Sequence, residues 1–407
     1  MNKTSNGARK ILIFSLVYYP RFIGGAEVAI KEITDRIPDS EYEFDMVTLR
    51  FDKTLPKVEK IGNVTIYRVG FVGEYRDSAD SLKFPLHLNK YLLPITGYLK
   101  ARKLHKKFQY DAVWSMMANY AGFAALFFKL ANPKVPFVLS LQEGDPIDYI
   151  KKRVGVFYFL FKKIFIKADL IQTISNYLGD FARSMGYMGK IEVVPNAVDT
   201  KFFSQEYSKE ELDSLKTKLH KKENDVFLIT TSRLVVKNAV DDVIKSLEFL
   251  PENVKFLILG QGYEEASLKK LVHSHDLDNR VKFLGFVEHK EMPKYLKISD
   301  IFIRPSLSEG FGNSFVEAMA TRIPVIATPV GGIIDFLFDP DRNPDREPTG
   351  LFVKTKDPRG IAKQVARLLE NPALRQQIII SAQKMVVEKY DWNIIAPTMK
   401  ERVFNQI

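Results

Sequence analysis

The chain has 407 residues, 46% of them hydrophobic and 27% charged, which is typical of packed globular proteins and excludes a disordered one. Since single cores stop growing at roughly 250–300 residues, the length favours two domains, and the absence of cysteine excludes disulfides and thiolate metal sites and fits a reducing cytosol. The net charge of +11 is concentrated in residues 1–200, which hold 29 Lys and Arg against 20 Asp and Glu; this indicates an anionic partner or a solvated face, without any nucleic-acid-binding motif.

Short apolar runs alternate with longer helical patterns along the chain. The first run, within MNKTSNGARKILIFSLVYYP, is interpreted as a buried strand and not a signal peptide, because no small-residue cleavage site follows it. Later runs are FDMVTL, VTIYRV, DAVWSMM, FVLSLQ, LIQTIS, IEVVPN, VFLITTS, KFLILG, VKFLGFV, DIFIRPS, PVIATP and GLFVK. Continuously apolar strands between helices predict parallel sheets covered on both faces, and two such series predict two doubly wound domains of the α/β class. The chain contains no run of about 18 uncharged apolar residues, so no membrane-spanning helix is expected.

A boundary is expected near residue 200, where the chain turns polar and charged after Pro195-Asn196. We expect an N-terminal Rossmann-like domain over 1–196, a second over 197–388, and a C-terminal helix in 389–407 that packs back on the first. Ligands of open α/β sheets bind at the carboxyl ends of the strands, so the cleft between two such domains is the expected site.

Glycines and cations follow several predicted strands. They are Gly24-Gly25, Arg233 with Lys237, Gly260 with Gly262, and Gly331-Gly332. Arginine and lysine at such positions suit phosphate, although a turn or a solvated surface explains each one equally well when taken alone. Gly260 and Gly262 form only part of a dinucleotide fingerprint, and no acidic residue ends a following strand about 20 residues on, which argues against NAD.

Residues 306–320, SLSEGFGNSFVEAMA, place Glu309 and Glu317 eight positions apart before and within a helical pattern. Ser314-x-x-Glu317 also matches a helix capping box, in which both side chains bond amides of the first turn. The functional alternative is that Ser314 caps the helix while Glu317 binds a ligand, because a capped helix start suits phosphate.

In the order and content of these motifs the chain resembles the retaining GT-B glycosyltransferases that use nucleotide-activated sugars. The segment PSLSEGFGNSFVEAMATRIPVIATPVGG is similar to that family's E-x7-E signature and glycine loop, VVPNAVDTKFF to its interdomain segment, and SRLVVKNAVDDVI to its Arg/Lys segment. The resemblance implies a GT-B architecture, with two Rossmann-like domains facing across a cleft, and transfer of a hexosyl or N-acetylhexosaminyl group in glycan or glycolipid biosynthesis. The implied donor is a UDP- or GDP-sugar, with no further cofactor and no metal.

The resemblance also implies roles for individual residues. Arg233 would bind the donor diphosphate, Glu309 the sugar hydroxyls and Glu317 the ribose. As catalytic residues it implies Arg233, Glu309, Lys237 and Gln142; as donor-binding residues it implies Gly25, Arg233, Gly262, Phe286, Glu309, Gly310, Phe311, Gly312, Asn313, Ser314 and Glu317. These assignments are chemically sensible, because an Arg and fixed amides stabilise a leaving diphosphate, and one carboxylate accepts hydrogen bonds from two vicinal hydroxyls.

Two positions depart from the family pattern. The family's usual Lys falls at Asn238, so Lys237 would have to substitute for it. A usual His falls at Gln142, which can form hydrogen bonds but cannot carry a proton; Asp145 is an alternative contributor, and an inactive relative is the other possibility. Asp339-Pro-Asp341 imitates the D-x-D of metal-dependent transferases but is expected to be a surface loop.

The acceptor is expected to bind the first domain and to be a saccharide or a lipid-linked saccharide. Residues 81–110 contain seven Lys and Arg and residues 149–168 contain six, with no acidic residue in either. Basic residues beside aromatic and aliphatic stripes are typical of interfacial membrane segments, and a buried helix with solvated lysines is the alternative. We therefore expect a cytoplasmic enzyme, with peripheral contact to the cytosolic face of an anionic membrane as a hypothesis and no nucleic-acid partner.

Two other functions remain open on the sequence alone. A nucleotide-sugar epimerase of the same fold would need a proton-transferring His near the sugar ring, whereas His220, His273, His275 and His289 lie in polar or helical stretches. A non-catalytic nucleotide-sugar binder would share the motifs but release no nucleotide.

Overall fold

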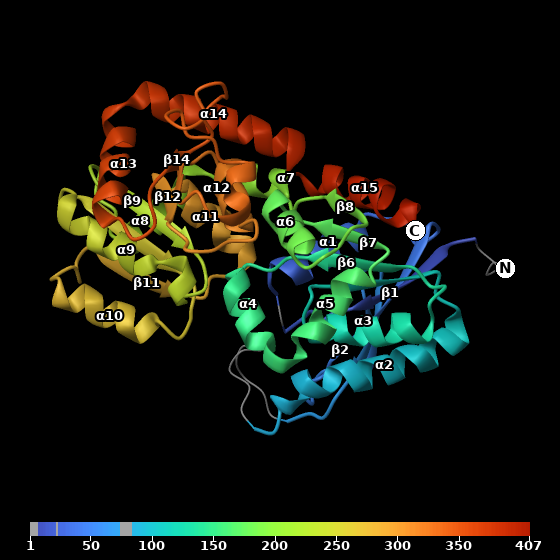
Figure 1. Ribbon diagram of the computed structural model, residues 1–407. Helices are drawn as coiled ribbons and strands as arrows, with labels where there is room; N and C mark the ends of the chain where they lie inside the picture. Colours follow the sequence, from blue (N-terminus) through green and yellow to red (C-terminus); the bar gives the residue numbers. More distant parts are fainter. Residues whose placement is uncertain (1–6, 22, 74–83) are drawn as a thin grey trace. The chain divides into compact units, whose positions relative to one another are not determined.

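The computed structural model describes residues 7–21, 23–73 and 84–407, and the chain divides into two compact units (Figure 1). Unit 1 comprises residues up to Asn196 together with Trp392–Ile407, and unit 2 comprises Ala197–Asp391. The second division lies three residues after the expected end at 388, because the helix α14 (Pro372–Lys389) continues through that position.

Unit 1 is built on an eight-stranded sheet in the order β3-β4-β2-β1-β5-β6-β7-β8. Its strands are β1 (Arg9–Phe14), β2 (Tyr42–Leu49), β3 (Val58–Ile61), β4 (Val64–Val69), β5 (Ala112–Met116), β6 (Phe137–Leu141), β7 (Leu170–Thr173) and β8 (Lys190–Val193). All pair in parallel except β3, which is antiparallel to β4. The sequence patterns missed β3, because this edge strand, VEKI, is short, half charged and not buried.

The helices of unit 1 cover the sheet in two groups. They are α1 (Gly25–Asp35), α2 (Leu88–Phe108), α3 (Tyr120–Ala131), α4 (Ile147–Val154), α5 (Tyr158–Ile166), α6 (Asn176–Ser184) and α15 (Trp392–Arg402), with the 3-10 turns η2 (Gly155–Phe157) and η7 (Phe404–Gln406). Helices α2, α3 and α5 pack side by side, whereas α1 packs with α15 (Figure 1). Strands β1 and β5–β7 are buried on both faces between these layers, as parallel sheets require.

Unit 2 is built on a six-stranded sheet in the order β11-β10-β9-β12-β13-β14, parallel throughout. Its strands are β9 (Val226–Thr231), β10 (Val254–Leu259), β11 (Val281–Gly285), β12 (Ile301–Arg304), β13 (Val325–Ala327) and β14 (Leu351–Phe352). Its helices are α7 (Thr200–Ser204), α8 (Lys209–Lys218), α9 (Val240–Ser246), α10 (Glu265–Ser274), α11 (Met292–Lys297), α12 (Asn313–Ala320), α13 (Pro358–Glu370) and α14, with the 3-10 turns η3 (Val236–Asn238), η4 (Leu247–Phe249), η5 (His289–Glu291) and η6 (Gly331–Asp335). The six predicted strands of this half are all present.

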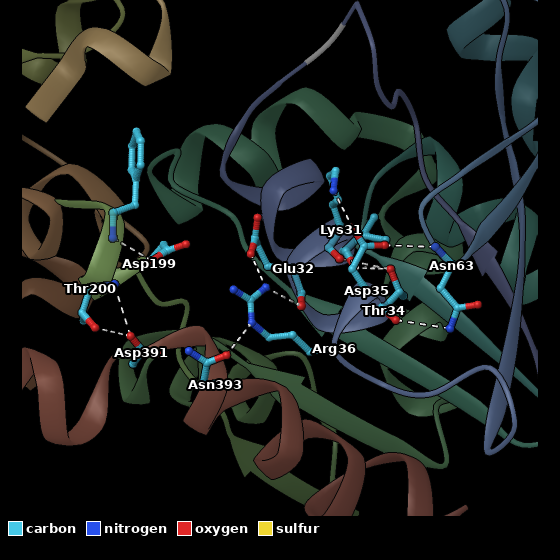
Figure 2. A network of polar contacts seen from close by, with 12 residues as sticks. Lys31, Glu32, Thr34, Asp35, Arg36, Asn63, Asp199, Thr200, Asp391 and Asn393 are labelled. Atoms are coloured by element: carbon cyan, nitrogen blue, oxygen red, sulfur yellow. Dashed lines mark hydrogen bonds and ion pairs between the residues drawn. The ribbon is translucent and has the colours of Figure 1, made fainter. Parts of the chain in front are cut away.

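The chain passes between the units twice, after Asn196 and after Asp391. Within unit 2 the two passages are bonded together: the Val198 amide donates to the Tyr390 carbonyl at 2.9 Å, and the Thr200 amide donates to Asp391 Oδ2 at 3.1 Å (Figure 2). A separate set of contacts fastens α15 within unit 1.

That fastening of α15 uses charged and amide side chains. Arg36 Nε donates to Asn393 Oδ1 at 3.1 Å (Figure 2), Lys400 pairs with Glu41 at 2.9 Å, and Arg9 Nη1 donates to the Phe404 carbonyl at 2.8 Å. The Phe404 ring packs against the ring of Trp114 at 5.1 Å. The last 16 residues are therefore an integral part of unit 1.

Candidate active site

The strand order of unit 2 reverses between β9 and β12. The chain proceeds outward from β9 to β10 and β11, and then returns to β12 and continues to β13 and β14 on the other side. The loops that follow β9 and β12 therefore lead away in opposite directions from the carboxyl ends of these two strands. Such a switch point is where open α/β sheets bind ligands. Arg233 and Lys237 lie in the first of these loops, and Glu309 lies in the second.

A backbone hydrogen bond joins these two loops. The Leu307 amide donates to the Lys237 carbonyl at 2.7 Å, so the loop after β12 is bonded to the turn η3. In the loop after β9, Asn238 Nδ2 donates to the Arg233 carbonyl at 2.7 Å. Asn238, which falls where the family usually has Lys, thus acts inside the loop as a buried brace, while Arg233 is exposed and Lys237 is partly exposed.

Two glycines allow the neighbouring loops to approach at van der Waals distance. A Cβ on Gly262 would lie 2.1 Å from the Leu234 carbonyl oxygen, and a Cβ on Gly331 would lie 1.7 Å from that of Glu309. No other residue fits at these positions, because the obstructing atoms are backbone. The loops after β9, β10, β12 and β13 consequently form one continuous rim, which the sequence indicated only as separate weak motifs.

Arg304, the last residue of β12, lies beneath this rim and was not predicted. Its Nη2 donates to Glu309 Oε2 at 2.8 Å, and its Nη1 donates to Ser314 Oγ at 2.7 Å. Its guanidinium also stacks on the Phe315 ring at 4.3 Å. The Arg304 and Glu309 side chains are 8% and 15% exposed, so this ion pair is largely, though not fully, shielded from solvent. An arginine ending an otherwise apolar buried strand was the available signal for it.

Glu317 lies in the second turn of α12, and the capping-box interpretation of Ser314 and Glu317 is wrong. The N-cap of α12 is Gly312, whose φ of 95° requires glycine, and Ser314 bonds Arg304 instead of a helix amide. Burial raises the pKa of Glu317 to about 7, although the Arg304 charge acts in the opposite direction. Glu317 therefore does not cap the helix, and its contact with a ligand stays a prediction.

The remaining predicted donor residues differ in exposure. Phe311 is buried against the rings of Phe336 and Tyr390, at 5.0 and 5.6 Å, so only its backbone is available to a ligand. Gly310 is buried, and Asn313 is partly buried beside Gly312. Phe286 follows β11 and is 72% exposed, as a side chain that contacts a ligand at the rim would be.

In unit 1, Gln142 follows β6 and forms a reciprocal amide pair with Asn196. Gln142 Nε2 donates to Asn196 Oδ1 at 3.2 Å, and Asn196 Nδ2 donates to Gln142 Oε1 at 3.0 Å. The next residue, Glu143, is buried and accepts the Ala118 amide at 2.7 Å. Burial raises the pKa of Glu143 to about 7. The Gln142 amide is therefore oriented by the residue at which the chain leaves unit 1.

Gly25 begins α1, and the Gly24 amide donates to the Glu27 carboxylate at 2.9 Å. An acidic side chain therefore already lies at this helix start.

The D-x-D-like pair lies in a loop, as expected, and Asp341 is exposed whereas Asp339 is buried. Asp339 is 2% exposed, and it accepts the Asp341 amide at 2.8 Å and the Phe352 amide at 2.6 Å. Asp341 forms a two-pronged ion pair with Arg367 at 2.7 and 2.9 Å. Both aspartates thus serve structural contacts, and the part of the chain that the structure describes contains no group of three or more His, Asp or Glu suited to a metal ion.

Comparison with known proteins bears on both halves of the chain. Residues 212–385 match the family described as glycosyl transferases group 1, and residues 23–202 match glycosyltransferase family 4. The chain belongs to the group 1 glycosyltransferases of GT-B fold. The switch-point rim, with Arg233 and Glu309, is accordingly a candidate active site of a glycosyltransferase.

Relatives of this glycosyltransferase extend over nearly its full length. An uncharacterized glycosyltransferase of Methanocaldococcus jannaschii is 26% identical, and the alignment covers 95% of this chain and 96% of that relative. Alpha-monoglucosyldiacylglycerol synthase of Acholeplasma laidlawii is 22% identical over 90% and 89%. The structure of the Anabaena protein HepE in complex with UDP-glucose superposes with a TM-score of 0.77 at 19% identity, over 97% and 99% of the two chains, which supports the fold.

Proposed function

We propose that this glycosyltransferase moves a sugar from a nucleotide-diphosphate sugar to a saccharide or lipid-linked acceptor, with retention of the anomeric configuration. The observation that supports this proposal most is the continuous rim at the switch point, where Arg233 and Lys237 lie on the loop bonded to the loop of Glu309. Cations and fixed amides at one strand-end edge suit a diphosphate, which develops negative charge as it leaves.

In the proposed reaction the acceptor oxygen forms a bond to the anomeric carbon, and the bond from that carbon to the diphosphate oxygen breaks. The acceptor proton passes to a donor phosphate oxygen on the same face. Arg233 stabilises the leaving diphosphate, Glu309 accepts hydrogen bonds from the sugar hydroxyls, and Glu317 accepts them from the ribose. Glu309 is not the proton acceptor in this scheme; its Oε2 accepts a hydrogen bond from Arg304 at 2.8 Å.

The same proposal includes donor contacts from the backbone amides of Phe311 to Ser314, from Gly262 and from Phe286. In unit 1, donor contacts from Gly25 and Gln142 stay predictions. Two findings on other proteins support a nucleotide sugar and a lipid-linked acceptor: HepE is seen with UDP-glucose, and the Acholeplasma laidlawii relative is named a monoglucosyldiacylglycerol synthase. The transferred group, hexosyl or N-acetylhexosaminyl, is part of the proposal.

A thermal-shift panel tests the donor first, because a ligand that binds the folded chain raises its melting temperature by mass action. We expect UDP or GDP to stabilise the chain while the matching monophosphate and adenosine diphosphate stabilise it less. Steady release of the nucleotide diphosphate from the sugar donor in the presence of an acceptor then separates an enzyme from a non-catalytic binder. A chain that is stabilised by no nucleotide diphosphate would contradict the proposal.

A further inference from the structure

We propose that the outer faces of α2 and of the α4–α5 turn in unit 1 form a docking surface for an anionic lipid bilayer. The proposal rests on the proposed function, because an enzyme that extends a lipid-linked acceptor must meet that acceptor at a membrane. Within residues 7–21, 23–73 and 84–407, no helix has the length and apolar character needed to cross a bilayer, so the contact considered is with the bilayer surface.

Helix α2 is apolar on two opposite faces. One face packs inward through Leu93, Gly97, Ala101 and Leu104, and a Cβ on Gly97 would lie 3.3 Å from Ala124 of α3. The opposite face presents a stripe of large apolar side chains that are between 36% and 61% exposed: Leu88, Tyr91, Leu92, Ile95 and Leu99. A helix with one face in the core is normally polar on the other, so an outer stripe of this apolar character is unusual for a solvent-facing helix.

The α4–α5 turn exposes a second apolar group. Gly155, with φ of 54°, separates α4 from α5, and the residues after it include Val156, Phe157 and Phe159, which are 93%, 64% and 69% exposed. Helix α4 itself has no buried residue. Large apolar side chains gathered on a surface in this way mark an interaction site more often than chance exposure.

Direct contacts join the two apolar groups into one surface. The Tyr91 ring of α2 lies 5.4 Å from the Tyr120 ring at the start of α3, and Tyr120 in turn shares a hydrogen bond with Arg153 of α4. Helix α3 also packs against both α2 and α5 (Figure 1). The stripe of α2 and the α4–α5 turn therefore belong to the same region of unit 1.

The charge around this surface identifies its partner as anionic. Residues 84–108 contain six Lys and Arg and residues 149–167 contain another six, with no Asp or Glu in either segment. On α2 the apolar stripe is followed by the exposed Arg102, Lys103 and Lys106, and Lys163 Nζ lies 4.3 Å from the centre of the Phe159 ring. Apolar side chains that enter the headgroup boundary while basic residues bind anionic headgroups are the features of interfacial membrane segments.

Flotation of the full chain with phosphatidylcholine vesicles, with and without phosphatidylglycerol, tests this surface. We expect binding only to the anionic vesicles and weakening by salt, since exposed charges are screened. The double variant Phe157→Ser/Phe159→Ser should lower binding to the anionic vesicles by roughly tenfold or more, because it removes the apolar tip without changing the charge.

The matched control is Ile380→Ser/Val387→Ser on α14, two apolar side chains that are 52% and 48% exposed in unit 2; it should float like the wild type. Lys151→Gln/Lys152→Gln should weaken the anionic binding and leave the apolar tip intact. The docking proposal is overturned if the wild type does not bind anionic vesicles, or if Phe157→Ser/Phe159→Ser binds them as the wild type does.

Donor binding by the same preparations, measured by thermal shift with UDP and GDP, keeps this test separate from the proposed function. A chain that binds a nucleotide diphosphate but no vesicle overturns the docking surface alone. A chain that binds anionic vesicles but no nucleotide diphosphate supports the docking surface and overturns the donor proposal.

Discussion

Arg304, which is buried, and Glu309, which is partly buried, form an ion pair at the end of β12, with Nη2 and Oε2 2.8 Å apart. The same guanidinium donates to Ser314 at 2.7 Å, and its charge opposes the rise in the pKa of Glu317. One side chain thus orients or electrically influences three of the predicted donor residues. We regard Arg304 as a positioning residue, because it acts through Glu309 and Ser314.

Replacing Arg304 with Met should destabilise the chain by about 3 kcal/mol, because breaking a buried pair leaves Glu309 uncompensated. Arg304→Met/Glu309→Gln should recover part of that loss, and chemical denaturation of the two single variants and the double variant measures the coupling. Arg304→Lys, which keeps the charge but not the two-pronged geometry, should keep more of the stability while lowering kcat/KM for sugar transfer. If the losses in the free energy of unfolding of the two single variants simply add in the double variant, Arg304 and Glu309 are not energetically coupled.

Glu317→Gln should weaken donor binding and stabilise the empty protein above neutral pH. Burial raises the Glu317 pKa from 4.5 to about 7, so the folded chain holds a proton there that the unfolded chain has lost. The stabilisation of the folded chain by the proton on Glu317 is complete below pH 4.5 and is lost as the pH rises through about 7. Glutamine carries no such charge, so at about pH 8 the variant should exceed the wild type by on the order of 2 kcal/mol.

The same titration predicts the pH dependence of donor affinity. Since the carboxylate is the better acceptor for two ribose hydroxyls, wild-type affinity should fall as the pH falls through about 7, and Glu317→Gln should lack this dependence. Calorimetric titration with the nucleotide diphosphate at several pH values measures it. An unchanged donor affinity in Glu317→Gln would exclude the ribose contact.

Arg233→Ala should lower kcat for transfer by roughly 10²-fold, since it removes one preorganised donor to the leaving group. Its effect on stability should be small, because the side chain is exposed. Lys270→Ala, an exposed cation on α10, is the matched control for the loss of charge. Release of the nucleotide diphosphate reports the rate, and equal rates in the Arg233 and Lys270 variants would contradict the diphosphate role.

Gln142→Ala and Asn196→Ala should each lower stability by about 1 kcal/mol, because each removes the two hydrogen bonds between these amides. The double variant should cost less than the sum of the two, since both single substitutions remove the same two hydrogen bonds. If Gln142 also contacts the donor, Gln142→Ala should weaken donor binding more than Asn196→Ala does. Equal effects of both on donor affinity would assign Gln142 to orienting the interdomain passage only.

The sequence by itself determined the alternation of strands and helices, the division near residue 196, the positions of Arg233 and Glu309 after strands, and that of Glu317 in the helix that follows. These features are local, because the side-chain period and the turn residues lie within a few positions of one another. It missed β3, where the short charged run VEKI carries no strand pattern, and it placed a helix cap at Ser314, because a capping box is recognised by spacing alone.

Only the tertiary structure decided what those residues contact. The backbone of Gly262 meets that of Leu234, Arg304 reaches Glu309 and Ser314, and Gln142 pairs with Asn196 across 54 positions of sequence. The contacts of Gly262 and Gln142 depend on which strands become neighbours and on which loops then meet at the sheet edge. A local pattern contains no information on that order, whereas the packed sheet fixes it.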